Sequence, residues 1–450
     1  MISSRAYSLI LLIFLIPTVA LATHTGNRYS IFLEKPELYV TKQKSFIDVS
    51  VFYATASTAC KRYGGTCGIP ELYGFYDLKD VISSLQKTNP GKYIGDNDPI
   101  YVVTGSDKLE GQELKFGVTG KVNTVGLILA YEQNLKFANL KNVTFGIWLP
   151  VMNSNVISRF EFNRKEYQTK YHIDLTDPEV QKIDAIRRLT HKEIGFKGTN
   201  ISRSGVGDID LHLRGNYFID HKLMMRSIDL NLQCGVVIPT GKKMDIDYPA
   251  STPFMNDGHW GVYLDFIPEF ELKQDLKIGL ILGGLWQFND NQNRRVAVYK
   301  EPSIYSALVG KIEIDPGNVF KISPYVTLEN LADGVHIQLR YAYLRHGMDK
   351  WNDKRNDKSI NCYLETNTRI DPTDATQNIT HDDLDKNLNY KNQLSKWRAH
   401  YFTIQAAYDS KLALKNWFMN PKFYASYDMP ISGNGFCKTH LVTLGAQLFF

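Results

Sequence analysis

The feature that most constrains the fold is a long alternation of apolar and polar residues within the stretch Gly205–Lys243. Because successive side chains of a β-strand point to opposite faces, this alternation predicts strands with one apolar and one polar face. Two alternating arms flank a short polar segment and predict one β-hairpin. Each arm keeps its stripe for about a dozen residues, near the length that a tilted strand needs to cross a bilayer, although a soluble sandwich strand alternates in the same way. The apolar stripe comprises Ile209, Leu211, Leu213, Tyr217 and Ile219, then Ile228, Leu230, Leu232, Cys234, Val236 and Ile238.

Residues 1–22 have the parts of a secretory signal peptide. Arg5 supplies the positive start, Leu9–Leu15 supplies the apolar core, and Ala20-Leu21-Ala22 supplies a small-x-small cleavage site. A membrane-anchor helix is the alternative, but the apolar run is short and Pro17 interrupts it. We therefore expect the mature chain to begin at Thr23, outside the cytoplasm.

The composition favours a membrane barrel over a helical membrane protein. Beyond residue 22, no apolar run approaches the roughly 18–20 residues of a transmembrane helix, and the mean hydropathy is −0.27. Aromatic residues make up 12% of the chain, including 26 tyrosines. Aromatic side chains favour strands and gather in girdles at both interfaces of outer-membrane barrels. The net charge of +5 is too small to predict a nucleic-acid partner.

The C-terminal segment His440–Phe450 alternates up to a terminal phenylalanine. Its pattern, polar-x-Gly-x-x-apolar-x-apolar, resembles the C-terminal insertion signal of outer-membrane β-barrels. The resemblance implies export followed by insertion, with outer-membrane lipid and the barrel-assembly machinery as partners. We therefore expect this chain in the outer membrane of a Gram-negative-type bacterium. The signal is filled here by Thr443, Gly445, Leu448 and Phe450.

The predicted fold is all-β, a transmembrane antiparallel β-barrel of about 14 strands within a range of 12 to 16. Residues 23–45 are predicted to be a periplasmic lead-in, and residues 46–450 the barrel. Three insertions do not alternate: 54–113 is a loop or a plug, and 153–204 and 346–396 are long loops. The predicted strands are 46–53, 114–121, 124–132, 142–151, 207–219, 228–238, 260–272, 276–288, 303–315, 319–329, 335–345, 398–409, 422–429 and 438–450.

Two of these insertions contain predicted helices. Asp77–Lys87 places its apolar residues on one helical face, and Asp177 is predicted to cap a second helix that begins at Pro178. A tight hairpin is predicted around Asn123. With short periplasmic turns and long outer loops, this strand count puts the insertion after His346 on the periplasmic side, which indicates that one strand is merged or missed.

The five cysteines are too few for a disulfide framework in an exported chain of this size. Cys60 and Cys67 could close a small loop, and Cys362 and Cys437 could pair between loops. Cys234 falls on the apolar stripe and is predicted to be an unpaired, lipid-facing residue.

The sequence contains no His-Glu-x-x-His, Cys-x-x-Cys or Gly-x-Ser-x-Gly motif. The segment from Gly235 to Lys243 differs from a phosphate-binding loop because its glycines are one residue too far apart and Lys243 replaces the Ser or Thr that would bind magnesium. We therefore predict no enzyme activity, no metal site and no cofactor. Gly207-Asp208 and Pro239-Thr240-Gly241 are predicted to shape strand ends rather than a binding site.

The polar faces of the predicted strands would enclose the barrel lumen. Acidic residues dominate the strands before residue 272, and basic residues dominate the next strands. Two interpretations stay open: an acidic wall facing a basic wall could orient solutes and filter ions, or the charges could pair between strands and fill the interior. The predicted pore-lining residues are Asp208, Asp210, His212, Arg214, Asp229, Asn231, Asp265, Glu269, Lys277, Lys311, Lys321, His336 and Arg340.

The stretch Gly205–Leu272 resembles the family of outer-membrane transporters associated with the meta-pathway of phenol degradation, which is similar to the FadL/TodX hydrocarbon and fatty-acid channels. The matching elements are 205–211 (Gly-Val-Gly-Asp-Ile-Asp-Leu) and 237–242 (Val-Ile-Pro-Thr-Gly-Lys). The resemblance implies a monomeric barrel, with or without a plug, that passes small apolar or aromatic molecules. Two features depart from the FadL group: its plug precedes the first strand, and its Asn-Pro-Ala motif has only a loose counterpart in Asn89-Pro90-Gly91.

The predicted function is therefore an outer-membrane channel for the passive passage of small solutes, hydrophobic or aromatic ones if the resemblance extends to the solute. One alternative is a surface protein in which 153–204 and 346–396 bind a partner and the barrel anchors them. A second is an enzyme that acts on lipid at the outer leaflet.

Overall fold

The computed structural model describes residues 45–88, 112–137, 140–220, 225–297, 300–355, 395–410 and 420–450. The predicted signal peptide, nearly all of the predicted lead-in, and most of the 346–396 insertion lie outside the described residues. Cys362 and Asn89-Pro90-Gly91 lie outside them as well.

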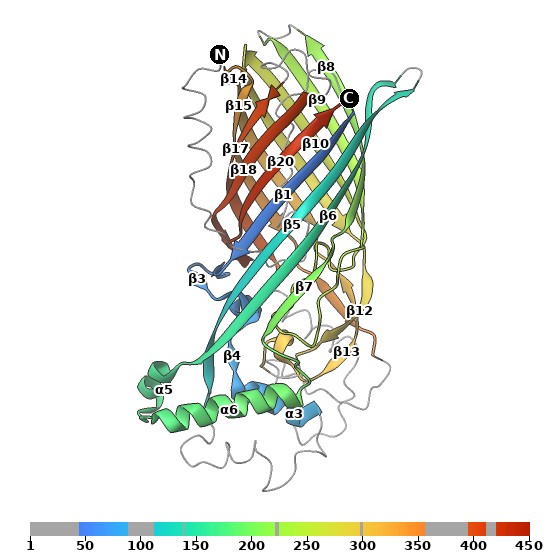
Figure 1. Cartoon of the computed structure of the whole chain (residues 1–450). Coiled ribbons are helices and arrows are strands. Elements are labelled where there is room, and N and C mark those ends of the chain that lie inside the picture. The colour runs from blue at the N-terminus through green and yellow to red at the C-terminus, as the bar shows by residue number, and fades with distance from the viewer. Residues whose placement is uncertain are drawn as a thin grey trace.

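Twelve strands form a closed antiparallel barrel (Figure 1). The barrel closes because β5 (Lys115–Phe137) pairs with both β1 (Phe46–Ala56) and β6 (Leu140–Phe162), so the ring of strands has no free edge. The predicted fold class is confirmed, with the strand number at the lower end of the expected range. From β6 the ring continues through β8 (Ile209–Asp220), β9 (Ser227–Ile238), β10 (Gly261–Lys273), β11 (Leu276–Gln287), β14 (Val319–Ala332), β15 (Val335–His346), β17 (Trp397–Asp409), β18 (Asn420–Asn434) and β20 (His440–Phe449) to β1.

The outer surface of the barrel is apolar on every strand. Each barrel strand carries at least one large apolar side chain with an exposed fraction between 37% and 52%, while the alternate residues face inward and are buried. A continuous apolar surface of this kind needs lipid rather than water around it. The outward side chains include Val51, Leu129, Val151, Leu213, Leu232, Leu264, Ile278, Val326, Leu339, Ile404, Phe423 and Leu444.

Residues 115–137 form one strand, so the predicted hairpin around Asn123 is wrong. Asn123 lies within β5, opposite Thr55 of β1 and Asn155 of β6. The polar residues at 121 and 123 interrupt the apolar stripe, and this interruption made one strand look like two. The predicted segments 114–121 and 124–132 are thus one strand, and the predicted strand 303–315 lies outside the barrel. With this corrected strand count, all the long connections fall at one end of the barrel, and the insertion after His346 no longer falls on the side of the short turns.

The outward faces of β5 and β6 change from apolar to polar part-way along both strands. Val125 and Leu129 point outward near the middle of β5, whereas Lys121 and Thr119 occupy outward positions closer to the start of the strand, toward the cap. Val125 pairs with Asn153, where the outward face of β6 changes in the same way. A lipid-facing strand must be apolar only across the hydrocarbon region, so this level marks one edge of that region.

At the barrel end opposite Phe450, the chain folds into a region that we call the cap (Figure 1). The projecting parts of β5 and β6 are extended at their edges by β4 (Tyr76–Asp77) and β7 (Asn200–Val206). A three-stranded sheet contains β12 (Asp290–Arg295), β13 (Val309–Asp315) and β16 (Lys350–Asp353), and a smaller one contains β2 (Ala59–Cys60), β3 (Thr66–Cys67) and β19 (Phe436–Cys437). The helical elements are η1 (Ile69–Tyr73), α3 (Leu78–Thr88), α5 (Arg164–Tyr171), α6 (Asp177–Glu193) and η2 (Ser303–Tyr305).

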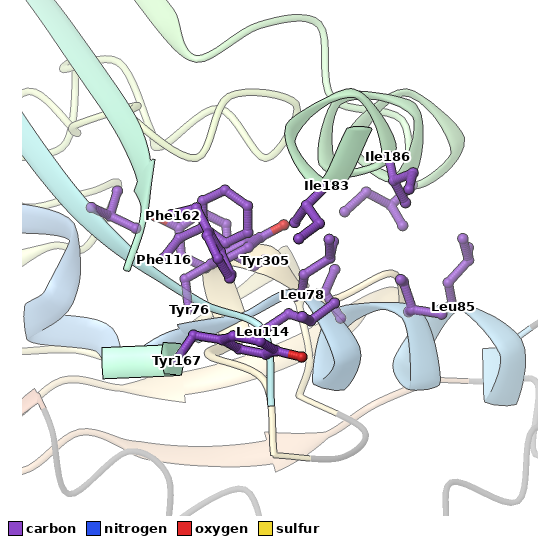
Figure 2. Close-up of a cluster of buried hydrophobic side chains, with 14 of the residues drawn as sticks. Tyr76, Leu78, Leu85, Leu114, Phe116, Phe162, Tyr167, Ile183, Ile186 and Tyr305 are labelled. Carbon is purple, nitrogen blue, oxygen red and sulfur yellow. The ribbon is translucent and has the colours of Figure 1, made fainter. Parts of the chain in front are cut away.

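The cap has its own aromatic core (Figure 2). The fully buried ring of Tyr76 packs edge-on against Phe116, Phe160 and Tyr305, with ring centroids 4.9 to 5.7 Å apart, as aromatic rings prefer. Helices α3 and α6 cover this core with the apolar faces expected from their sequences. Such a core makes the cap a folded unit rather than a set of independent loops.

Both predicted helices form, with boundaries one residue from those predicted. Helix α3 begins and ends one residue later than predicted, and α6 begins one residue earlier, so Thr176 rather than Asp177 is the N-cap. The Glu179 carboxylate accepts a hydrogen bond from the Thr176 backbone N–H at 2.7 Å. Among the described residues, no helix combines the length and the apolar character that a membrane span requires.

Of the described part of the 54–113 insertion, residues 54–56 belong to the barrel strand β1 and residues 57–88 lie in the cap. Strands β2 and β3, η1 and α3 all sit beyond the barrel end (Figure 1), and Leu78 and Leu85 of α3 are buried in the cap core. The assignment of 54–113 as a loop or a plug stays a prediction.

Candidate functional site

All the predicted pore-lining residues except Lys311 have buried side chains, with exposed fractions of 8% or less. Most of them occupy inward positions on the barrel strands, because they alternate with the exposed apolar residues. The inner space is therefore narrow, and polar side chains occupy much of it. Their role in lining a path for solutes stays a prediction.

Lys311 does not line the barrel. It is exposed on β13, which pairs with β12 and β16 in the cap instead of with barrel neighbours. The predicted strand 303–315 is instead η2 followed by the shorter β13. Alternation shows that a segment is a strand with two different faces, but it does not show which sheet the strand joins.

The inward charges are neutralised locally by ion pairs. Lys321 Nζ lies 3.0 Å from Asp265, and Lys277 Nζ lies 2.9 Å from Glu329 and 3.4 Å from Glu269. A third pair joins Arg340 to Asp428 of β18 at 3.5 Å. Of the two interpretations left open by the sequence, these contacts favour paired charges over opposed acidic and basic walls.

Small residues between the partners let two of these pairs, Asp265–Lys321 and Arg340–Asp428, form along the wall. Asp265 on β10 and Lys321 on β14 both lie opposite Gly283 of the intervening β11. Likewise, Arg340 on β15 and Asp428 on β18 both lie opposite Thr403 of β17, whose hydroxyl donates to Asp428 at 2.5 Å. Each pair therefore spans one strand around the circumference rather than crossing the lumen.

Three inward tyrosines also lie over a small residue of the neighbouring strand. Tyr263, Tyr325 and Tyr424 lie opposite Gly235, Gly279 and Gly445, and a Cβ at any of these glycines would fall within 2.5 Å of the tyrosine ring. Each ring thus lies flat over the neighbouring strand. The hydroxyls then donate to carboxylates at 2.9 Å, on Asp210, Glu269 and Asp48 respectively.

The remaining predicted residues extend this polar lining. His212 lies between Asp210 at 3.2 Å and Glu132 at 3.4 Å. Arg214 Nε donates to Asn231 at 3.2 Å, and Asn231 donates to Asp229 at 3.1 Å. His336 is fully buried on β15, in register with Ala407 of β17.

Asp208 closes a strand end at the mouth of the barrel. Its carboxylate accepts hydrogen bonds from the backbone N–H groups of Gly241 at 2.8 Å and Asn256 at 2.7 Å. The Thr240 hydroxyl donates to the Gly207 carbonyl at 2.7 Å. The Gly-Asp and Pro-Thr-Gly elements therefore join the two strand ends, as the sequence predicts.

The predicted insertion signal lies along the C-terminal part of β20 and just past its end. Thr443 faces inward, and Gly445 accommodates the Tyr424 ring. Phe450 is exposed, stacks on Tyr131 at 6.4 Å, and donates its backbone N–H to the Ser45 carbonyl at 3.0 Å. Recognition of this strand by the assembly machinery stays a prediction.

A cavity of about 210 Å³ lies between the cap and the barrel mouth. The outermost inward-facing side chains of three barrel strands, Gln287, His346 and Trp397, line one part of it. The cap contributes the rest, including Tyr73, Tyr248, Ile304, Arg294, Arg295 and Trp351. The cavity is therefore mainly aromatic and apolar with a few convergent polar groups, which is the usual composition of a small-molecule site.

Arg295 connects three segments beside this cavity. Its guanidinium donates to the carbonyls of Ile246 at 2.6 Å, Ser306 at 2.7 Å and Ile194 at 3.1 Å. It also stacks over the Phe196 ring at 4.2 Å. Burial lowers the pKa of Arg295 to about 10, so the side chain still carries its charge at neutral pH.

Cys60, Cys67 and Cys234 are free thiols. Cys67 lies opposite Ala59, and Cys60 lies opposite Thr66, so the side chains of Cys60 and Cys67 point to opposite faces of this ladder. Burial raises the pKa of Cys67 to about 11, which keeps its thiol protonated. Cys234 is exposed on the outer face of β9, as predicted.

The sequence gives little indication of the cavity. Its lining comes from segments scattered between residues 72 and 435, so no local spacing reveals it. Adjacent Arg294 and Arg295 in a polar segment are the one visible signal, and they have no recognised motif. Among the described residues, no group of three or more His, Cys, Asp or Glu could hold a metal ion.

Comparison with known proteins gives structural similarity without sequence similarity. No protein-family model matches the chain, and no curated protein matches it. An outer membrane channel from Pseudomonas putida F1 is 10% identical, with a TM-score of 0.47 over 93% of this chain and 100% of that one. The translocator domain of autotransporter NalP from Neisseria meningitidis (10% identity, TM-score 0.35, 92% and 91% covered) and a FadL homologue from Pseudomonas aeruginosa (9% identity, TM-score 0.31, 91% of each chain) are also similar. Because the TM-scores of these three structures are below 0.5, the fold assignment rests on the strand pairing described above.

Proposed function

We propose that this chain is an outer-membrane channel that passes small solutes between the cap cavity and the interior of the barrel. The position of the cavity supports this proposal, because Gln287, His346 and Trp397 belong both to its lining and to the outermost inward layer of the barrel. The long connections lie at the cap end, and the short turns lie at the end that holds Ser45 and Phe450. Outer-membrane barrels place short turns in the periplasm and long loops outside, so the cap is the extracellular end.

In this proposal, the inward side chains that form ion pairs act as a gate for solutes. Side chains exposed by 8% or less leave a path too narrow for an organic solute, so passage requires them to move. The pairs lie along the wall, and the intervening glycines keep the tyrosine rings there as well. Rotation of a few side chains can therefore widen the path without breaking the barrel.

The solute class follows from the cavity walls. Trp351, Trp397, Tyr73 and Tyr248 offer aromatic faces, and Ile304 and Met244 add aliphatic ones. Such walls favour solutes with an apolar or aromatic part. This composition agrees with the hydrophobic solutes implied by the family resemblance.

Conductance in planar bilayers tests the proposal. The wild-type chain should give resolved current steps, and the double substitution Lys321→Met with Asp265→Asn should raise the open probability, because it removes the attraction that holds the gate. Changing both partners avoids leaving one buried charge alone. The matched control is Lys243→Met with Asp290→Asn, an ion pair of 2.5 Å in the cap outside the cavity lining, which should leave the current unchanged. Silence from both the wild type and the interior variant, with intact barrels, would contradict a channel.

The second candidate function is a barrel-anchored surface protein. The aromatic core of the cap favours it, because a simple pore has no need of a separately packed outer unit. In that case the barrel conducts nothing, and the cap alone binds a partner. The same bilayer measurement separates the two functions.

A further inference from the structure

The charges around the cavity are unequally compensated. Arg294 donates to the Asp257 carboxylate and to Gln292, and His346 Nε2 lies 3.6 Å from the Asp349 carboxylate. Arg295 differs, because its only acceptors among the described residues are the three backbone carbonyls. Carbonyl dipoles solvate a guanidinium without neutralising it, so Arg295 keeps its charge with no carboxylate in hydrogen-bond contact among the described residues.

The nearby histidine adds no second charge. His259 Nδ1 donates to the Phe288 carbonyl at 3.0 Å, and its Nε2 accepts from the Gln292 amide at 3.2 Å. Both ring nitrogens are thus used by a neutral imidazole, and burial lowers the pKa of His259. Of the two arginines on the cavity lining, Arg295 is therefore the one that has no carboxylate within hydrogen-bond distance among the described residues.

One donor of Arg295 is also available. Its Nε and Nη1 are used by the Ile246, Ile194 and Ser306 carbonyls, but Nη2 has no hydrogen-bond partner among the described residues. Arg295 is only 6% exposed and lines the cavity. A buried cation with a spare donor is the group that a carboxylate satisfies best.

We propose that the cap cavity binds small organic carboxylates, with the carboxylate at Nη2 of Arg295 and the apolar part against Trp351 and Trp397. The volume of about 210 Å³ is several times the roughly 30 Å³ that one water molecule occupies, so a small organic acid fits. An inorganic anion would interact with the charge of Arg295 but would leave the aromatic walls of the cavity uncovered. This inference rests on the proposed function for its role in transport, but equilibrium binding tests it separately.

The test compares two ligands of the same shape, benzoate and benzamide, by calorimetry on the full chain in detergent at neutral pH. Benzoate should bind at least tenfold more tightly, and Arg295→Gln should reduce its affinity to that of benzamide. The matched control is Arg188→Gln, an exposed arginine on α6 that pairs with Asp184, which should keep the preference. Equal affinities in the wild type, no binding of either ligand, or displacement of benzoate by an equal concentration of inorganic phosphate would overturn the proposal.

A second variant covers the case in which Arg295→Gln fails to fold, since Arg295 connects three segments. Trp351→Ala leaves the guanidinium in place and removes part of the apolar wall. It should weaken both ligands by a similar factor and keep the preference for benzoate, and loss of the preference would contradict the assignment of Arg295. Benzoate binding without conductance would overturn the channel alone, and conductance without a benzoate preference would overturn this inference alone.

Discussion

Single side chains in the barrel interior lie along the wall because their cross-strand neighbours are small. Tyr325 occupies the space over Gly279 and still reaches Glu269 on the next strand with its hydroxyl. Alternation in the sequence shows that these residues face inward, but it does not show which ones become neighbours. That information depends on the register between strands, which no local pattern contains.

Substitution of Gly279 tests this arrangement. A Cβ there would lie 2.1 Å from the Tyr325 ring, so Gly279→Ala should destabilise the barrel by about 1–3 kcal/mol through overpacking. The measurement is the urea midpoint of the heat-modifiable folded form. Gly284→Ala is the control on the same strand, because its nearest neighbour is the side chain of Trp286 at 3.1 Å, which faces outward and can move. Equal losses at the two glycines would exclude the proposed role of the ring.

His191 makes the cap sensitive to acid. Burial, together with the positive charge of Arg187, lowers its pKa to about 3, and Nε2 is hydrogen-bonded to Tyr76 at 2.8 Å. In the unfolded chain the pKa is about 6.5, so the unfolded state binds more protons between these values. The cap is therefore fully stabilised above about pH 6.5 and loses about 1.4 kcal/mol for each pH unit below it, until pH approaches 3.

Circular dichroism at 222 nm measures this loss, because the described α-helices all lie in the cap. The urea midpoint of the helical signal should fall between pH 7 and pH 4.5, and His191→Gln should remove most of that dependence. A pH-independent midpoint in the wild type would show that His191 titrates normally.

At the scale of elements, most of the strands could be predicted, but β5 could not be predicted as one strand. The strands with an unbroken apolar stripe, such as β8, β9 and β15, were predicted within one or two residues at most ends. The long strand β5 was split because Lys121 and Asn123 point outward beyond the membrane, where a strand no longer needs an apolar face. A rule that assumes lipid along the whole strand therefore fails where strands project from the bilayer.

The outward face of β5 changes from apolar to polar, so the effect of a charged substitution should differ between its two parts. Leu129→Arg places a charge among lipid-facing residues and should lower folding stability by about 2–4 kcal/mol if it lies near the midplane, less toward either interface. Thr119→Arg, at an outward position in the cap, should change stability by under about 0.5 kcal/mol. Urea unfolding in lipid vesicles compares the two variants, and similar effects would mean that the membrane edge is misplaced.

At the scale of the whole molecule, the sequence predicted a barrel with long insertions but not a packed cap over its mouth. The cap core joins Tyr76, Phe160, His191 and Tyr305 from four separate segments. No segment alone indicates this core, because its apolar residues find partners only in the folded chain. The cavity could not be predicted from the sequence for the same reason, since its lining combines the cap with the ends of barrel strands.

The central claim is that solutes pass through this cavity into the barrel, and a cysteine at Ser303 tests it most directly. Ser303 lines the cavity from η2 and is partly exposed. In a variant with the native cysteines replaced, Ser303→Cys should carry current until a bulky thiol reagent is added from the cap side, whereas Thr119→Cys on the outer face should not respond. An unchanged current after complete modification of Ser303→Cys would contradict the proposed path.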